Sequence, residues 1–158
     1  MKTCRLIVAA AAVAVILPAH PASPGVGDPL NTLYIFPGVR DSGEADNTGV
    51  ATSIHCSNFS SVLEKIQYIV LNYDGHTKVN SIGNIGPAQT KTVSTHQTQL
   101  YFEDVALNTG AIEQGVVGVS ATNNNMVCTA QVLDASANVP RGIDLHGIRL
   151  NPIPGTQE

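Results

Sequence analysis

Oxygen donors gather in one predicted loop of this 158-residue chain. Asp41, Glu44, Asp46 and Asn47 lie within seven consecutive residues, and carboxylate and amide oxygens are the ligands that Ca²⁺ prefers. An EF-hand would need donors at alternate positions, a glycine at the sixth position and a bidentate glutamate at the twelfth, and the loop does not fit this pattern. The spacing therefore favours a solvated acidic loop over a calcium site.

Histidine and sulfur are the other candidate metal ligands. The histidines after residue 22 occur one per segment, without HxH, HxxxH or HxxEH spacing: His55, His76, His96 and His146. Met126 and Cys128 share a face of a predicted strand and, with His55, could offer soft ligands to copper. Blue-copper domains, however, place the cysteine before the histidine and methionine in one loop. We expect no metal or other cofactor, and a site built from dispersed histidines is the alternative.

Two serines stand in sequences that resemble nucleophile motifs. Ser42 in RDSGE is similar to the GDSG of trypsin-like proteases, but Arg40 replaces the first glycine and the chain is too short for two barrels. Ser120 in GVSAT lacks the last glycine of GxSxG, whose elbow also needs a strand-to-helix turn. No paired carboxylates, nucleophile and base, or phosphate-binding glycine loop can be identified. The sequence favours a protein without catalytic activity, and a small secreted hydrolase with a dispersed site is the alternative.

A polar strand face is the remaining candidate. Hydroxyl and imidazole side chains alternate along one predicted strand: Thr90, Thr92, Ser94, His96 and Thr98. Such a flat face could bind a carbohydrate, although threonine on the solvent side of a strand is also what β-propensity alone selects. The surface candidates from the sequence are therefore Thr90, Thr92 and His96, together with Asp41, Glu44 and Asp46.

The first residues of the chain have the pattern of an export signal. Lys2 and Arg5 are followed by an apolar run at 6–17 and then by Pro18 and small residues. This pattern predicts a signal peptide over 1–22, cleaved after Ala19 or Ala22. The run is too short to span a bilayer, so we expect a secreted or periplasmic protein without a membrane anchor.

Export decides the roles of the cysteines. Cys4 leaves with the leader, and Cys56 and Cys128 remain. An even number of cysteines in an oxidising compartment predicts a disulfide, with two buried free thiols as the alternative. Such a bond would close a loop of about 70 residues and stabilise the fold by about 4 kcal/mol.

Charge argues against polyanionic partners. Without the leader, six scattered basic residues face 12 acidic ones. Nucleic acid and anionic membranes are therefore not expected partners, because they are bound by clustered Lys and Arg.

The elements themselves are predicted to be strands. Only 13% of the residues are charged and 43% are hydrophobic, which suits a β-rich domain better than helices with charged outer faces. Residues 33–36 form a short first strand, 37–49 a loop, and 49–59 an alternating strand with Cys56 facing inward. Residues 65–73 predict a central strand, followed by a type I′ hairpin at Asp74-Gly75.

The second half of the chain continues this pattern. Strands are predicted at 89–98 and 98–107, and GVVGVSAT and MVCTAQVLD form a hairpin through Asn123, Asn124 and Asn125. IDLHGIRL at 143–150 is the last strand.

About seven or eight short strands with frequent turns predict an antiparallel β-sandwich. Cysteines in the second and the penultimate strand resemble the bridge between the sheets of immunoglobulin-like domains. The chain has no Trp to pack on that bridge, and Met126 stands where the tyrosine corner would lie. A jelly roll is the alternative. The expected organisation is a flexible segment at 23–32, a sandwich at 33–151 and a tail at 152–158.

Several segments also resemble a family of small, secreted bacterial proteins with no established activity. They are GVATSIHCSNF, LNTG at 107–110, VCTAQVLDA and the ending LHGIRLNPIPGTQE. The resemblance implies bacterial secretion and a single all-β domain, and it transfers no catalytic or binding residue. We expect a non-catalytic binding, adhesion or structural module whose ligand is a protein or a glycan. A periplasmic metal-binding protein is the alternative.

Overall fold

The computed structural model describes residues 26–101 and 103–150. The predicted signal peptide (1–22) and tail (152–158) lie outside the described residues, as does part of the segment 23–32. Within that segment, Asn31 and Thr32 already belong to the first strand.

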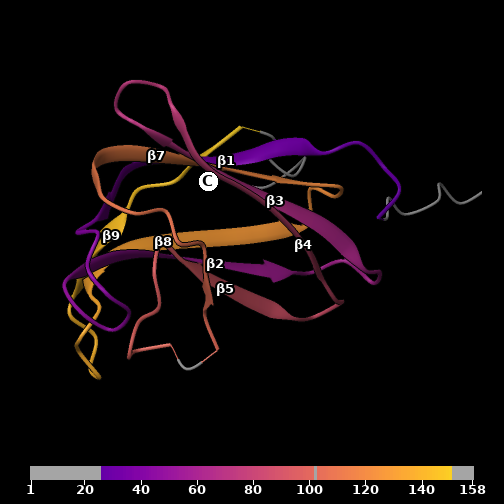
Figure 1. The fold of residues 1–158 in the computed structure, drawn as a ribbon. Coiled ribbons are helices and arrows are strands. Elements are labelled where there is room, and N and C mark those ends of the chain that lie inside the picture. Colours follow the sequence, from indigo (N-terminus) through magenta and orange to yellow (C-terminus); the bar gives the residue numbers. More distant parts are fainter. Residues whose placement is uncertain (1–25, 102, 151–158) are drawn as a thin grey trace, which may run out of the picture.

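The described chain folds into two stacked five-stranded sheets and contains no helix (Figure 1). Sheet I has the order β10-β1-β7-β3-β4, and sheet II has the order β6-β5-β2-β8-β9. The strands are β1 (Asn31–Asp41), β2 (Val50–Asn58), β3 (Glu64–Asn72), β4 (Thr77–Ile85), β5 (Thr90–Ser94), β6 (Val105–Ala106), β7 (Ile112–Ala121), β8 (Met126–Asp134), β9 (Gly142–Leu145) and β10 (Ile148–Arg149). All pairings are antiparallel except the parallel contact between β5 and β6.

The predicted all-β sandwich is confirmed. Two of the ten strands, β6 and β10, are only two residues long. Within residues 26–101 and 103–150, no helix is long and apolar enough to cross a bilayer.

The core lies between the two sheets and is formed by alternate residues of their strands. In β3 the buried side chains are Ile66, Tyr68 and Val70, and each fully buried aliphatic or aromatic side chain contributes about 1.5–3 kcal/mol. The intervening Ile69 and Leu71 are half-buried on the outer face. β3 pairs with β7 on one side and β4 on the other, as expected of a strand that is apolar on both faces.

Two polar side chains of β3 are also buried. Glu64 is fully buried, and its carboxylate accepts hydrogen bonds from the hydroxyls of Ser60 (2.9 Å) and Thr122. The hydroxyl of Tyr68 has no hydrogen-bond partner among the described residues, and burial raises its pKa. The two hydroxyl groups thus give the buried carboxylate of Glu64 the hydrogen bonds that it would otherwise form with water.

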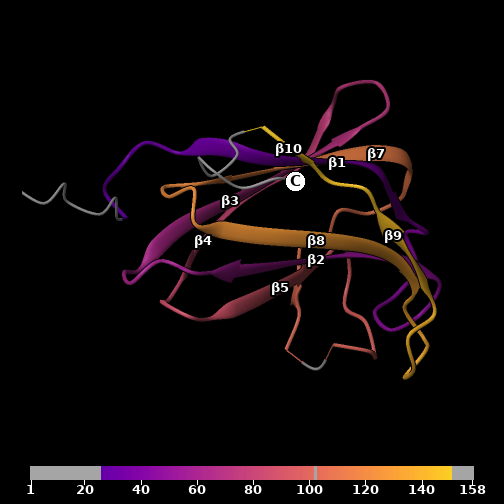
Figure 2. The same cartoon turned by 180° about the vertical axis from the view of Figure 1, so that it is seen from behind.

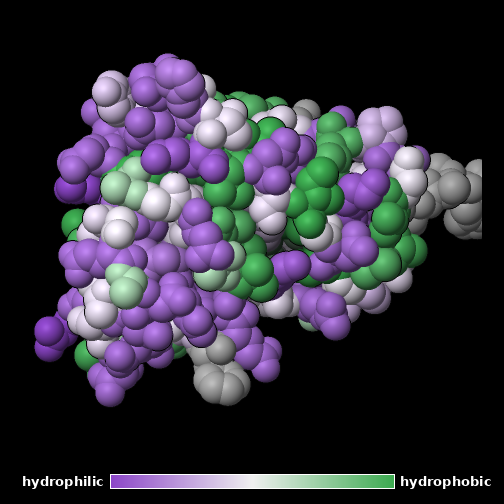
Figure 3. Space-filling model, in the orientation of Figure 1, coloured by the Kyte–Doolittle hydropathy of each residue, from purple (hydrophilic) through white to green (hydrophobic). Residues whose placement is uncertain are grey.

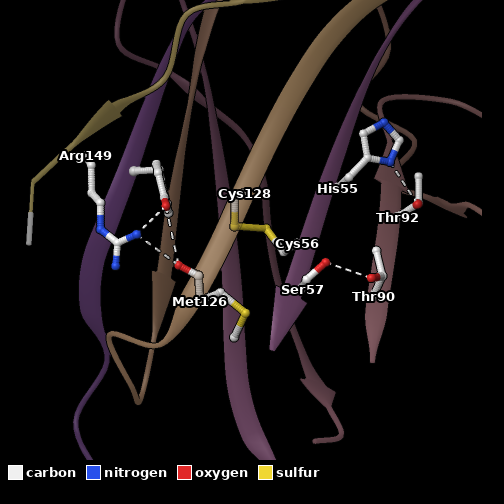
Figure 4. The surroundings of a disulfide bond; sticks show 9 residues. His55, Cys56, Ser57, Thr90, Thr92, Met126, Cys128 and Arg149 are labelled. Atoms are coloured by element: carbon white, nitrogen blue, oxygen red, sulfur yellow. Dashed lines mark hydrogen bonds between the residues drawn. A yellow bond between two sulfur atoms is a disulfide. The ribbon is translucent and has the colours of Figure 1, made fainter. Parts of the chain in front are cut away.

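The predicted disulfide joins Cys56 to Cys128. Its position differs from the expected bridge between sheets, because β2 and β8 are neighbours in sheet II and the two cysteines are directly opposite each other. Their Cα atoms are 4.2 Å apart, a spacing typical of a non-hydrogen-bonded antiparallel pair. Figure 4 shows the bond crossing between these two strands. The immunoglobulin-like bridge is therefore wrong, although the pairing is right.

Three predicted connections are also corrected. β7 and β8 do not form a hairpin, because β7 belongs to sheet I and β8 to sheet II. The residues 37–49 are not all loop, since β1 continues to Asp41 through an irregularity at Gly38, where φ is 90°. β5 ends at Ser94, and only Val105–Ala106 of the strand predicted at 98–107 is formed.

The β3–β4 hairpin has a longer turn than predicted. The N–H of Gly75 donates to the carbonyl of Asn72 (3.0 Å), and of the residues in the turn only Gly75 has a positive φ (82°). This is a type I turn followed by a left-handed glycine, a three-residue loop in place of type I′. In both ribbon views the tip of this hairpin stands beyond β1 and β7, on the side away from sheet II (Figures 1 and 2).

The predicted last strand is divided between the two sheets. β9 pairs with β8 in sheet II, and β10 pairs with β1 in sheet I. The chain crosses between them at Gly147, where an added Cβ would lie 2.3 Å from the ring of Phe36. Arg149 then donates to the hydroxyl of Tyr34 (2.6 Å) and to the carbonyl of Asn124 (2.6 Å). A single short segment therefore pairs with a strand of each sheet and links the two sheets at one edge of the sandwich.

Candidate functional site

The outer face of sheet II carries a row of paired hydroxyl and imidazole groups. β2 and β5 are antiparallel neighbours, so His55 lies opposite Thr92 and Ser57 lies opposite Thr90. The Nδ1 atom of His55 is 3.0 Å from Oγ1 of Thr92, and the hydroxyls of Ser57 and Thr90 are 2.7 Å apart (Figure 4). Thr90 and Thr92 are thus on the outer face, as predicted.

An aromatic ring from the following loop covers part of this row. The ring of Tyr101 contacts His55 edge to face, with centroids 4.4 Å apart. The side-chain amide of Gln131, in β8, donates to the Tyr101 hydroxyl and lies 3.4 Å from Nε2 of His55. Neither residue was among the candidates predicted from the sequence. Gln131 could have been found from the alternation of its strand, whereas Tyr101 was assigned to a strand that does not form.

These groups are uncharged near neutral pH. Burial lowers the pKa of His55 below its ordinary value of 6.5, and the negative charge of Asp104 opposes this shift only in part. Burial likewise raises the pKa of the Tyr101 hydroxyl, which keeps its proton. The outer face of sheet II therefore offers neutral donors and acceptors.

A cleft adjoins this row at the edge of sheet II. It has a volume of about 480 Å³, and we call it the β5 cleft. β6 pairs only with Val93 and Ser94, so among the described residues no strand pairs with Thr90–Thr92 on the side of β5 away from β2. The lining residues are Asn84, Ile85, Gln89, Thr90, Lys91, Thr92, Leu100, Tyr101 and Glu103. The cleft thus continues the hydroxyl row with amide groups and the Tyr101 ring, together with the charged side chains of Lys91 and Glu103.

The pair of Thr92 and His55 is poorly arranged for nucleophilic catalysis. The amide nitrogen of Gln131 is a donor that faces Nε2 of His55, so the proton of the neutral ring lies on Nδ1. Nδ1 then donates to Thr92 and cannot remove its hydroxyl proton. The arrangement presents a hydroxyl group to a ligand rather than generating an alkoxide.

His96 and Asp41 lie in a second cluster, which is buried. The His96 Nδ1 atom is 2.9 Å from Oδ2 of Asp41, and its Nε2 atom is 2.9 Å from the carbonyl oxygen of Thr48. Both partners only accept hydrogen bonds, so both ring nitrogens carry hydrogen and the contact is an ion pair. Asp41 also accepts hydrogen bonds from the N–H of Gly43 (2.6 Å) and the hydroxyl of Thr109 (3.3 Å).

This cluster corrects two predicted surface candidates. The side chains of His96 and Asp41 are only 6% and 1% exposed, because β5 ends at Ser94 and the chain then turns inward over the end of β1. Glu44 and Asp46 remain exposed in the loop, beside a cavity of about 370 Å³. The acidic residues therefore divide between a buried structural contact and a solvated loop.

The other candidate ligands are scattered. His76 lies 2.9 Å from Asp74 at the exposed hairpin tip, and His146 is exposed between β9 and β10. The copper set is wrong, because Cys128 is in the disulfide and His55 faces outward while Met126 is in the core. In the part of the chain that the structure describes, no three His, Cys, Asp or Glu side chains are grouped to hold a metal ion.

The serines of the two nucleophile-like motifs have structural contacts. The Ser42 hydroxyl oxygen accepts a hydrogen bond from the N–H of Val50 (3.0 Å), and the Ser120 hydroxyl donates to Thr32 (3.2 Å).

Comparison with protein-family models, curated proteins and solved structures finds no match for this chain.

Proposed function

We propose that this protein is a secreted or periplasmic, non-catalytic module that binds a neutral glycan chain on the outer face of sheet II and in the β5 cleft. The observation that carries the proposal is the uncharged row of His55, Thr92, Ser57 and Thr90 beside a cleft walled by Tyr101. The hydroxyl groups of sugars both donate and accept, and so do the groups of this row.

The cleft and the disulfide support this proposal. A volume of about 480 Å³ is within the usual range of about 300–1,000 Å³ for small-ligand sites. The aromatic ring of Tyr101 supplies an apolar surface for the C–H face of a sugar, with its hydroxyl fixed by Gln131. The Cys56–Cys128 disulfide fits the oxidising compartments in which extracellular glycans occur.

Replacing Tyr101 by Ala is expected to weaken glycan binding about tenfold, because it removes the stacking surface and the partner of Gln131. The measurement is the mobility of the protein in native gels that contain neutral soluble polysaccharides, namely xylan, mannan, pullulan and laminarin. Tyr73→Ala is the matched control, since Tyr73 is 73% exposed at the distant hairpin tip. Unchanged mobility of the wild-type protein in all four gels, or equal loss in both variants, would contradict glycan binding.

Binding is also expected to depend on pH through His55. The fold favours the neutral ring, so the stability that His55 contributes is fully present above pH 6.5 and is lost as the pH falls through its lowered pKa. Protonation would also turn Nε2 into a donor that faces the Gln131 amide. Retardation in the gels should therefore decrease as the pH falls below 6.5 and through the lowered pKa of His55, and His55→Gln should remove this pH dependence. An NMR titration that places the His55 midpoint above 6.5 would refute the prediction.

A further inference from the structure

One side of the disulfide faces a cavity. β9 pairs with β8 only as far as Leu145, which lies opposite Ala130. Among the described residues, therefore, no strand pairs with Cys128 on the side of β8 away from β2. A cavity of about 310 Å³ lies here, and Cys128 lines it together with Phe36 of β1, Ala130, Leu145 and the crossing residue Gly147. Cys128 is therefore in contact with a space that a small molecule can enter.

The other side of the disulfide is closed. Cys56 is fully buried (0% exposed, against 6% for Cys128), and its neighbour on β5 is Lys91. The side chain of Lys91 extends to β4, where its Nζ atom lies 2.7 Å from the position that a Cβ on Gly83 would take. Lys91 thus covers the side of Cys56 away from Cys128. Cys56 lines neither the β5 cleft nor the cavity beside Cys128, so the two sulfur atoms differ in access.

The surroundings of the cavity suit a charged attacking group. Disulfides are exchanged by attack of a thiolate anion, at a rate that depends on access to the sulfur. Where Figure 1 places β9, the surface in Figure 3 is mostly hydrophilic, whereas hydrophobic residues follow the line of β3. A thiolate therefore stays hydrated as it approaches this end of the sandwich. Asp144 is the charged residue of the cavity lining, and its carboxylate disfavours thiols that carry a further negative charge.

We propose that small neutral or cationic thiols enter this cavity and exchange with the disulfide at Cys128 while the sandwich stays folded. The bond crosses from β2 to β8 (Figure 4), so a thiolate in the cavity meets Cys128 from the side away from Cys56. The attacking, central and leaving sulfur atoms then lie close to one line, as the displacement requires.

The exchange balances without a further reagent. The thiol gives its proton to water, and its sulfur forms a new bond to Sγ of Cys128. The Cys56–Cys128 bond breaks, and its electron pair leaves on Sγ of Cys56, which takes up a proton. The incoming sulfur is oxidised and Cys56 is reduced. The thiol is then held in the cavity as a mixed disulfide on Cys128, and attack by Cys56 releases it again.

The first test is the position at which cysteamine, a cationic thiol, adds to the wild-type protein. The folded protein is incubated with cysteamine, quenched with acid and digested with pepsin at low pH, where disulfides do not rearrange, and mass spectrometry locates the adduct. We expect the first adduct on Cys128, in at least about tenfold excess over Cys56. About 1 M urea should change the rate by less than about twofold, whereas exchange through global unfolding would accelerate by at least about fivefold.

Two substitutions on β9 test the route of entry. Leu145→Trp fills the cavity and should slow the reaction of Cys128 about tenfold. The matched control is Ile143→Trp, which places the same side chain on the same strand at a position that is 75% exposed and outside the cavity lining. This control should react at the wild-type rate. Circular dichroism melting curves show whether both variants fold, and the wild-type measurements decide the proposal if Leu145→Trp does not.

Three results would overturn the proposal. They are a first adduct on Cys56 or equally on both cysteines, a rate that rises with urea as global unfolding does, and a folded Leu145→Trp that reacts as fast as the wild type. A folded protein that does not react with cysteamine at all is also incompatible with it. Glycan binding has no part in this exchange, so Tyr101→Ala should react at the wild-type rate.

Discussion

Replacing Cys56 and Cys128 together by Ala is expected to lower the free energy of unfolding by about 4 kcal/mol. The bond spans 72 residues of sequence, and the stabilisation arises chiefly because the cross-link restricts the unfolded chain. This is a large part of the stability of about 5–15 kcal/mol that is typical of a domain. The measurement is urea unfolding followed by far-UV circular dichroism, since the chain has no Trp.

Reduction of the wild-type protein supplies the control for this pair of substitutions. Both cysteines are buried, so Ala also removes two packed sulfur atoms. Reduced wild type keeps the sulfur atoms and loses only the cross-link. The free energy of unfolding of the reduced wild type should lie between those of the oxidised protein and the double variant. An unfolding midpoint that does not move when the protein is reduced would contradict the prediction.

His96→Ala is expected to lower the free energy of unfolding by about 3–5 kcal/mol, because it leaves the carboxylate of Asp41 buried without its cation. The side chain of Asp41 is 1% exposed, and without the imidazole its carboxylate keeps only the hydrogen bonds from Gly43 and Thr109. Nε2 of the same ring is hydrogen-bonded to the carbonyl of Thr48 and so holds the loop in place. Urea unfolding measures the loss, and His76→Ala at the exposed hairpin tip is the matched control, expected to change stability by less than about 0.5 kcal/mol.

A double variant separates the ion pair from simple loss of packing. Asp41→Leu combined with His96→Leu replaces both charges by apolar groups of similar volume, and such replacements are often neutral or stabilising. The double variant should therefore be more stable than His96→Ala alone. If the double variant and the single variant lose the same free energy, the buried charge is not the cause.

The local part of the fold could be predicted from the sequence. The alternation of residues in β2 correctly predicted that Cys56 points into the core. The apolar run of β3 correctly predicted a strand with a neighbour on each side. Strand pairing could not be predicted, because it depends on contacts between residues far apart in the chain. Consecutive strands β7 and β8 were therefore joined as a hairpin although they belong to different sheets.

The candidate site was predicted as far as the strand that carries it. Thr90 and Thr92 face outward because β5 keeps its period of two up to Ser94. His96 lies beyond that end, where the backbone turns and its side chain reaches Asp41. Tyr101 reaches the site from a loop, and loop conformation is not encoded in a simple periodicity.

The division of the last segment between the two sheets has a consequence for biosynthesis. β9 and β10 form edges of different sheets. β1 pairs with β7, which follows it by about 80 residues, so this pairing also cannot form until β7 has emerged. A polypeptide that emerges from its amino end therefore cannot complete sheet II before Leu145, or sheet I before Arg149, is free. Pairings between such distant residues also form slowly. For the secreted or periplasmic protein that we propose, this order of folding would let the chain cross the membrane before the sandwich assembles.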